Sequence, residues 1–361
     1  MRRILVINPG STSTKIAVFE DRKPVFGLTL RHPVSEIDKF AHIIDQYEFR
    51  QKVILEALVN AGYKLKDFDA IVGRGGLIKP IPSGVYEVNE AMIHDLQIAL
   101  SGEHACNLGG MIAVKIAERA NMEGANGIKA YIADPVVVDE LQDLARITGH
   151  PMYTRKSIFH ALNQKAIAKR YAKETGRPYN SLNLIVAHMG GGISVGAHLK
   201  GRVIDVNNAL QGEGPFSPDR MGGILVKDIV DTCYSGKFTK EEMMKFVSGR
   251  GGAVAMVGTN NFKEIRERAD GGDGKCKMVL DAFVYNMAKQ IGSTSAVLRG
   301  KVDAILLTGG IAYDKGVTDG ITGYVSFIAP VKVYPGEDEM AALADNGFDV
   351  LEGEVKSEIY K

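Results

Sequence analysis

The chain carries two copies of one short pattern, half a chain apart, and this repeat limits the possible folds more than any other feature. Residues 4–23 read as an apolar strand, a polar turn around Gly10, a second apolar strand and a charged tight turn. Residues 184–203 give the same order without a gap, 180 residues later (184 − 4), with Gly190 in the place of Gly10. One hairpin can arise by accident, but a gapless second copy indicates an internal repeat. We therefore predict two domains with the same core topology.

The first turn has the composition of a phosphate-binding loop. Gly10 lets the backbone bend close to a ligand, Lys15 adds a positive charge, and the turn offers amide and hydroxyl groups. These groups belong to Asn8, Ser11, Thr12, Ser13 and Thr14. The usual P-loop pattern is absent, because an alternating apolar run and not a helix follows Lys15. Taken alone, the stretch is equally consistent with an ordinary polar hairpin turn. Its repetition favours two phosphate-holding hairpins, one per domain, that grip one nucleotide.

The composition excludes several classes of protein. A formal net charge of +1, from 44 basic and 43 acidic residues, gives no global field that would attract nucleic acid or an anionic membrane. The N-terminal apolar run ends after four residues, which is too short for a signal peptide. No stretch approaches the roughly 18 uninterrupted apolar residues that span a bilayer. The three cysteines are far apart and lack metal-ligand spacing, so we expect a reducing, cytoplasmic location.

Strand and helix patterns alternate along the chain, which predicts a mixed or largely parallel sheet with helices on its faces. Apolar runs that end in glycine doublets indicate backbone that approaches a ligand, and the glycine content, about 11% against a usual 7%, supports this. The predicted strands cover residues 4–7, 16–19, 25–30, 70–72, 130–133 and 304–308. The predicted helices cover residues 38–61, 89–101, 108–120, 157–175, 240–247, 281–298 and 338–346.

Three motifs together resemble the acetate and sugar kinase/actin-like superfamily. They are N-x-G-S-T-S-x-K at residues 8–15, H-x-G-x-G at residues 188–192 and TGGIA at residues 308–312, and the similarity runs in order over essentially the whole chain. Within the superfamily, the chain is most similar to the carboxylate kinases of the acetokinase family. Gly191 and residues 221–223 depart from the acetate kinase pattern and favour a butyrate-type enzyme.

The resemblance implies an α/β fold of two duplicated actin-like (ribonuclease H-like) domains with a nucleotide cleft between them. Residues 1–155, completed by a C-terminal helix within 337–361, would form domain I with the first phosphate hairpin and the acid-binding residues. Residues 156–336 would form domain II with the second hairpin and the adenosine site.

The resemblance also assigns site residues. Its four catalytic positions are Arg74 in GRGG, Asp134 after a strand, His160 in IFHALNQK and Arg220 in FSPDRMGG. Without the resemblance, Arg74 could be a solvated loop residue between glycines, and a histidine placed like His160 is more often a core residue than a catalytic one. His104 lies near a further active-site position and is left open. The nucleotide-binding positions are Asn8, Ser11, Ser13, Lys15, His188, Gly190, Gly192, Asn261, Phe262, Lys263, Gly309, Gly310 and Ile311. Mg²⁺ would be held by Asn8 and by Asp338 or Glu339.

The implied activity is reversible, ATP-dependent phosphorylation of a short-chain carboxylate, butyrate or a branched-chain analogue, by direct in-line transfer. ATP/ADP and Mg²⁺ are the expected cofactors, and the protein is expected to be at least a dimer. A carboxylate, with a reference pKa of about 4, needs no strong base. Cations are needed instead, because two unit charges 4 Å apart cost about 4 kcal/mol at an effective dielectric of 20.

Three alternatives stay open beside this activity. They are an acetate or propionate kinase of the same family, a non-metabolic actin-like ATPase, and a sugar or polyol kinase. A sugar kinase needs an acidic base for a neutral hydroxyl, so the two arginines fit it poorly.

Overall fold

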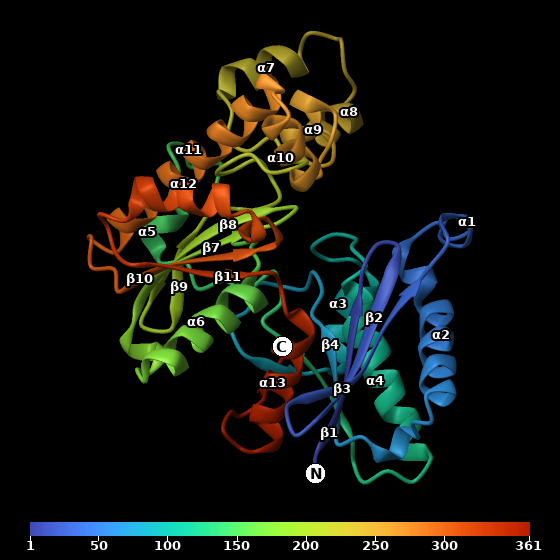
Figure 1. Ribbon diagram of the computed structural model, residues 1–361. Coiled ribbons are helices and arrows are strands. Elements are labelled where there is room, and N and C mark those ends of the chain that lie inside the picture. Colours follow the sequence, from blue (N-terminus) through green and yellow to red (C-terminus); the bar gives the residue numbers. More distant parts are fainter. The chain divides into compact units, whose positions relative to one another are not determined.

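Two β-sheets organise the computed structural model, which describes residues 1–361, and each sheet belongs to its own unit (Figure 1). The first unit comprises Met1–Val138 and Asp338–Lys361, and the second comprises Asp139–Glu337. The sequence analysis placed the boundary after residue 155, whereas the second unit begins at Asp139. None of the helices combines the length and the apolar character needed to cross a membrane.

Arg155 shows why the segment before it folds with the second unit. Its guanidinium donates to Asp205 Oδ1 at 2.9 Å, to Glu213 Oε1 at 2.7 Å and to the Val206 carbonyl at 3.0 Å. All three acceptors belong to the second unit. The backbone N–H of Gln142 also donates to the Ile204 carbonyl at 2.9 Å, so the segment is tied to the second unit at two points.

The sheet of the first unit has seven strands in the order β12-β5-β6-β4-β1-β2-β3. β1 is antiparallel to β2 and parallel to β4, and β4 is parallel to β6. The strands are β1 Arg3–Pro9, β2 Ser13–Glu20, β3 Lys23–Arg31, β4 Ala70–Arg74, β5 Val85–Glu87, β6 Lys129–Ala133 and β12 Glu358–Ile359. The three N-terminal strands and the strands predicted at residues 70–72 and 130–133 are confirmed.

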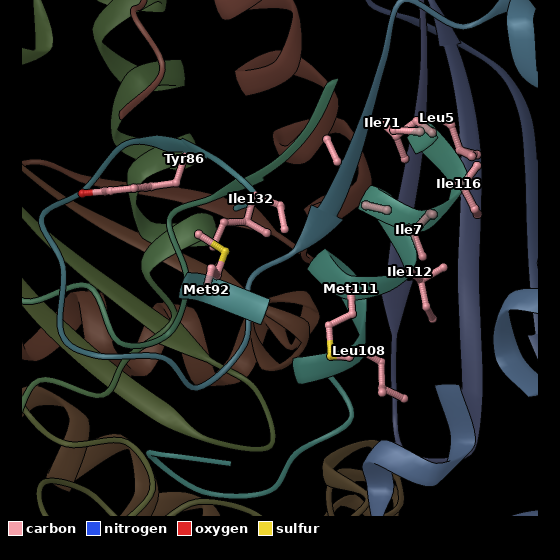
Figure 2. Close-up of a cluster of buried hydrophobic side chains, with 14 of the residues drawn as sticks. Leu5, Ile7, Ile71, Tyr86, Met92, Leu108, Met111, Ile112, Ile116 and Ile132 are labelled. Atoms are coloured by element: carbon pink, nitrogen blue, oxygen red, sulfur yellow. The ribbon is translucent and has the colours of Figure 1, made fainter. Parts of the chain in front are cut away.

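The central strands of this sheet are buried on both faces, which explains their continuous apolar sequences. On one face, Leu5 and Ile7 of β1 pack with Ile112 and Ile116 of helix α4, as Figure 2 shows. On the other face lies helix α13, whose Gly347 approaches Ile4. The helices of the unit are α1 Val34–Ile37, α2 Tyr47–Asn60, α3 Glu90–Gln97, α4 Asn107–Met122 and α13 Glu339–Leu351, with 3-10 turns at Ile43–Gln46 and Leu65–Asp67.

The second sheet has five strands in the order β11-β10-β7-β8-β9. Helix α11 packs on the β7, β8 and β9 side and helix α6 on β7 and β10. The strands are β7 Asn183–Met189, β8 Ile193–Leu199, β9 Arg202–Val206, β10 Ala304–Gly309 and β11 Val331–Pro335. The helices are α5 Asp143–Arg146, α6 Ala161–Thr175, α7 Val226–Cys233, α8 Lys240–Val247, α9 Gly252–Val257, α10 Phe262–Asp270, α11 Gly274–Val297 and α12 Lys315–Val325, with 3-10 turns at Tyr179–Ser181 and Gly310–Tyr313.

The two sheets repeat one arrangement, as the sequence repeat predicted. The order β6-β4-β1-β2-β3 in the first matches β11-β10-β7-β8-β9 in the second, with the same parallel and antiparallel pairs. The repeat is not gapless, however. Asn8 faces Lys15 across the first hairpin, but His188 faces Ser194 and not Val195 across the second. The second tip is one residue shorter, so the offset of 180 residues holds for the first strand only.

The structure corrects three predicted helices at their N-terminal ends. The helix predicted from residue 281 begins at Gly274, because Asp273 caps it by accepting the Lys275 and Cys276 N–H groups. The helix predicted from residue 38 begins at Tyr47, after a separate 3-10 turn, and Phe40 packs on Phe49 from outside it. The helix predicted from residue 157 begins at Ala161. The carbonyl of Ile158 instead accepts a hydrogen bond from Ala209 N at 2.9 Å, which keeps this segment extended and makes His160 the N-cap.

The contact between α13 and the first sheet gives a stability prediction. A Cβ at Gly347 would lie 2.7 Å from Val72 Cγ2 and 2.9 Å from Ile4 Cδ1. We expect Gly347→Ala to lower the free energy of unfolding by about 1–3 kcal/mol, measured by urea denaturation. Gly292→Ala in α11 is the matched control, because a Cβ there meets nothing within 4 Å. It should leave stability unchanged or raise it by up to ~1 kcal/mol, and equal losses in both variants would contradict the prediction.

Candidate active site

In the first unit, three residues that the sequence analysis selected lie in direct contact. Glu339 Oε2 accepts hydrogen bonds from Asn8 Nδ2 and from Arg74 Nη1, each at 2.7 Å. Arg74 Nη1 also lies 3.4 Å from Asn8 Oδ1. The cluster holds one cation, one carboxylate and one amide, and the Arg74 side chain is about a quarter exposed. The carboxylate fixes the direction of the Arg74 guanidinium, whose exposed part can donate hydrogen bonds to an anionic ligand.

The fold explains how these residues meet. Asn8, next to the last residue of β1, and Arg74, the last residue of β4, lie at the same edge of the sheet, because the two strands are parallel neighbours. Glu339 is the first residue of α13, where a carboxylate is favoured by the helix dipole. Asp338 instead caps helix α13, because its Oδ1 accepts a hydrogen bond from the Ala341 N–H at 3.0 Å. Of the two acidic candidates, Glu339 is the one in contact with Asn8 and Arg74.

Asp134 follows β6, the next strand along this edge, and is buried. Its Oδ1 accepts hydrogen bonds from Ser83 Oγ at 2.7 Å and Gly84 N at 2.9 Å. Its φ of 38° lies in the left-handed region, which costs a non-glycine residue free energy. Asp134 thus fixes the Ser83–Gly84 turn beside the edge, and no hydrogen bond joins it to Arg74.

The tip of the first hairpin presents its side chains outward. Ser11 and Lys15 are exposed and Ser13 is half-buried. The carbonyls of the tip point the other way, toward the buried guanidinium of Arg50 on α2. The sequence analysis placed α2 in this region but did not select Arg50. The signal that was available was a polar residue on the apolar face of the helix.

In the second unit, the two predicted histidines stack on each other. The rings of His160 and His188 lie 3.7 Å apart between centroids and within 10° of parallel. His188 Nδ1 bonds Asn163 Oδ1 at 2.8 Å, which places a proton on Nδ1, and its Nε2 lies 3.0 Å from Glu337 Oε1. His160 Nδ1 lies 2.9 Å from Ser194 Oγ. Asn163, Ser194 and Glu337 were not selected from the sequence, although Glu337 directly precedes the selected Asp338 and Glu339.

Arg220 lies against the tip of the second hairpin. A Cβ at Gly192 would overlap its Nη1, so only glycine leaves room for this guanidinium. Nη1 donates to the Ala209 carbonyl at 2.6 Å, while Nε is buried without a hydrogen-bond partner. Burial lowers the pKa of Arg220, and Asp219 opposes that shift only in part. The buried Nε–H group, which has no hydrogen-bond partner in the protein, can donate to a bound anion.

Ser217, also not selected, fixes the loop that carries Arg220. Its Oγ donates to the Gly191 carbonyl at 2.6 Å and accepts from Arg220 N at 3.1 Å. One serine therefore ties this loop to the hairpin tip. Gly190 provides room of the same kind as Gly192, because a Cβ there would lie 2.8 Å from Glu337 Oε1 and 3.0 Å from His188 Nε2. The structure thus brings together His160, His188, Gly190, Gly192 and Arg220.

The three residues predicted to contact the adenosine part have separate environments. Asn261 caps helix α10 through hydrogen bonds from the N–H groups of Lys263 and Glu264. Phe262 is buried, and its ring packs edge-on against Phe283 at 4.9 Å between centroids. Its side chain is thus engaged in the core, which leaves its backbone for a ligand contact. Lys263 is exposed.

Gly309, Gly310 and Ile311 follow strand β10 beside the end of β7. Gly309 has a φ of 91°, and a Cβ would overlap the backbone of Met189. Gly310 is exposed, and a Cβ added there would meet nothing within 4 Å, whereas Ile311 is buried in the core. Backbone therefore forms the accessible surface here, which suits a flat apolar ligand.

His104, which the sequence left open, belongs to a local turn. Its Nδ1 accepts the Cys106 N–H at 3.2 Å and lies 3.0 Å from Cys106 Sγ. Burial raises the pKa of the Cys106 thiol to about 11. These contacts lie at the start of α4, and the charges of Arg74 and Glu339 shift the pKa of the same thiol in opposite directions.

Comparison with known sequences gives the family. A family model described as "Acetokinase family" matches residues 144–318. The chain is 55% identical over 361 residues to Butyrate kinase 1 of Clostridium acetobutylicum, covering 100% of both chains. It is 56% identical over 359 residues to Butyrate kinase 2 of the same organism, covering 99% of each. The chain belongs to the acetokinase family.

Solved structures of this family confirm the predicted fold. Acetate kinase from Porphyromonas gingivalis matches with a TM-score of 0.79 at 18% identity, covering 97% of this chain and 100% of that one. Acetate kinase from Entamoeba histolytica gives 0.77 at 14% identity, covering 97% and 100%. A propionate kinase from Francisella tularensis gives 0.75 at 18% identity, covering 96% and 99%. The acetokinase architecture thus extends over the chain as two actin-like domains.

The packing of Arg220 on the second tip yields a test of this acetokinase site. We expect Gly192→Ala to displace the guanidinium and lower kcat by about 10²-fold or more, as removal of one transition-state donor does. Gly191→Ala is the matched control, since a Cβ there meets nothing within 4 Å. Steady-state kinase assays on both variants, with thermal melts to confirm folding, make the measurement. Equal activity in the two variants would remove Arg220 from the site.

Proposed function

We propose that this chain phosphorylates butyrate, or a branched-chain analogue, with ATP to give the acyl phosphate and ADP, and that it also catalyses the reverse transfer. The observation that carries the proposal is the 55% identity to Butyrate kinase 1 over the full chain. The site chemistry agrees with it, because Arg74 lies at the sheet edge of the first unit and His188, with His160 and Arg220 nearby, at that of the second.

The reaction asks for positioning and charge stabilisation more than for covalent chemistry. A carboxylate oxygen attacks the γ-phosphorus, the new O–P bond forms, and the bond to the ADP oxygen breaks. The acid is already ionised near neutral pH, so no residue has to remove a proton. The repulsion between two anions has to be offset, and cations in a site of low dielectric do this.

In the first unit, we assign Arg74 to the carboxylate group of the acid. Its guanidinium fork matches carboxylate geometry, and Glu339 and Asn8 hold it in place. Ser11, Ser13 and Lys15 at the exposed hairpin tip hold nucleotide phosphates. Asp134 orders the turn beside them, which makes it a positioning residue in this proposal.

Mg²⁺ is the proposed metal, and the oxygen-bearing side chains of the first unit fit it. Mg²⁺ prefers oxygen ligands and keeps several waters and phosphate oxygens, so few protein ligands are required. Glu339 with Asn8 would hold it, while Asp338 is occupied as the helix cap. Bound with the nucleotide, the ion would neutralise phosphate charge.

In the second unit, we assign Arg220 and His160 to the transferring phosphoryl group. His188, Gly190 and Gly192 form the second phosphate tip, with Asn163 and Glu337 fixing the His188 ring. The adenosine part would lie against Gly309, Gly310 and Ile311 and the start of α10 at Asn261, Phe262 and Lys263.

The assembly and location follow the sequence expectations as proposals. We propose a homo-oligomer of at least two chains. The three cysteines are free, and two of them are buried, which suits a reducing cytoplasm.

An acid panel tests the function. Protein, MgATP, hydroxylamine and one straight or branched acid of two to six carbons are incubated, and the acyl hydroxamate is measured. We expect the largest kcat/KM with butyrate or a branched four- to five-carbon acid. A larger value with acetate or propionate would reassign the substrate within the family. ATP hydrolysis indifferent to every acid would favour an actin-like ATPase.

The role of Arg74 is tested separately. We expect Arg74→Ala to raise the KM for butyrate and to lower kcat/KM by about 10²-fold, because a charge-assisted bidentate contact is lost. The KM for MgATP should change little. Arg119→Ala, on the exposed side of α4 in an ion pair with Glu123, is the control. Unchanged butyrate kinetics in Arg74→Ala would exclude it from the acid site.

A further inference from the structure

Arg50, on helix α2, is fully buried, yet it has no carboxylate partner. Its guanidinium donates to neutral groups only. The acceptors are the carbonyls of Gly10, Ser11 and Ser13 at 2.7, 2.9 and 3.1 Å, Thr14 Oγ1 at 3.1 Å, and Gln46 Oε1 at 2.8 and 3.1 Å. Three of these acceptors are main-chain groups of the first hairpin tip.

The guanidinium fixes the direction of the peptide groups at this tip. In a planar trans peptide, a carbonyl and the N–H of the next residue point in opposite directions. No cis peptide bond occurs in the chain. Because the carbonyls of Gly10 and Ser11 point at Arg50, the N–H groups of Ser11 and Thr12 point away from it. Both residues are exposed, so two backbone donors face outward where an anion can bind them.

The environment leaves the positive charge of Arg50 without compensation. Burial lowers the pKa of Arg50 to about 10, so the group remains charged at neutral pH. His32, which bonds Thr14 Oγ1 at 2.9 Å, has its pKa lowered to about 4 by burial and by the Arg50 charge, and it is neutral. Gln46 is neutral as well. Burying an unpaired charge costs folding free energy. If the Arg50 guanidinium only held the hairpin in place, a neighbouring carboxylate would make the protein more stable.

We propose that Arg50 is a positioning residue for nucleotide phosphate: from behind the first hairpin tip it orients the outward N–H groups and supplies an uncompensated positive charge. The inference rests on the proposed function in one respect, namely that this tip holds phosphate. Arg50 touches no substrate and acts through the tip. Its contribution is to nucleotide binding and not to acid binding.

The substitution Gln46→Glu separates the charge of Arg50 from its structural role. Glutamate has nearly the shape of glutamine, keeps both hydrogen bonds to Arg50 and adds the missing negative charge. We expect the midpoint of thermal unfolding to stay or rise, while MgADP binding, measured by calorimetry, weakens by about three- to thirtyfold. The KM for MgATP should rise with it, and the KM for butyrate should not. Adenosine, which carries no phosphate, should bind as to the unchanged protein.

Gln51→Glu is the matched control, because it adds the same charge to the same helix at a half-buried position outside this network. It should leave MgADP binding unchanged. Equal MgADP affinity in Gln46→Glu and the unchanged protein, with folding retained, would overturn the proposal. Equal weakening in both glutamate variants would also overturn it, since net charge alone would then explain the effect.

A second pair of variants decides the question if Gln46→Glu does not fold. Arg50→Lys and Arg50→Met both remove the guanidinium fork, but only the lysine keeps a charge. We expect MgADP to bind the lysine variant at least threefold more tightly than the methionine variant at similar thermal stability. Equal affinities would show that the charge has no role.

Lys15→Met distinguishes failure of this inference from failure of the site assignment. If Lys15→Met weakens MgADP binding and Gln46→Glu does not, the tip holds phosphate and only the role of Arg50 is refuted. If neither variant weakens it, the tip is not the phosphate site, and the assignment under the proposed function fails.

Discussion

The parallel alignment of the central strands is the constraint on which the sites depend. β1, β4 and β6 point the same way in one sheet, and β7, β10 and β11 do so in the other. Residues that follow such strands must gather at one sheet edge, however far apart they lie in sequence. Asn8 and Arg74 meet in this way, and so do His188 and Glu337. A site of this kind requires no long-range specification beyond strand order, because the backbone hydrogen bonds bring its members together.

The arginines of the molecule fall into two groups by their partners. Arg155, which holds the second unit together, is matched by Asp205 and Glu213. Arg50, behind the first hairpin tip, is buried among neutral acceptors only. Arg220, beside the second tip, is partly exposed, donates to the Ala209 carbonyl and has Asp219 Oδ1 3.8 Å from its Nε. A paired arginine contributes geometry but little field, whereas a charge surrounded by neutral groups in low dielectric acts strongly on a nearby anion.

The sequence predicted the strands and the duplication well because both depend on local pattern. Apolar runs such as residues 4–7 are strands buried on both faces of a sheet, and the pattern of each run can be read without its neighbours. Prediction from the sequence failed where a contact between residues distant in sequence determines the local conformation. The extended segment before His160 is held by a hydrogen bond to Ala209, and no periodicity reports that. Arg50 was missed for a similar reason: its place on the apolar face of α2 indicates burial, but only the structure shows the hairpin that it contacts. The site residues came from motifs, and their contacts needed the three-dimensional structure.

The one-residue difference between the hairpins explains how one scaffold presents charge in two ways. The first tip has four residues between paired positions and carries its own hydroxyls, with Arg50 supporting it from behind. The second has three, all of them glycine, and offers no side chain. Polar groups at this tip must therefore come from neighbouring residues, and the absence of side chains leaves room for them. Arg220 occupies the space beside Gly192, and the carboxylate of Glu337 occupies the space beside Gly190. Lengthening the second tip with residues that carry a Cβ would exclude these groups, so glycine content and partner identity at this tip are fixed together.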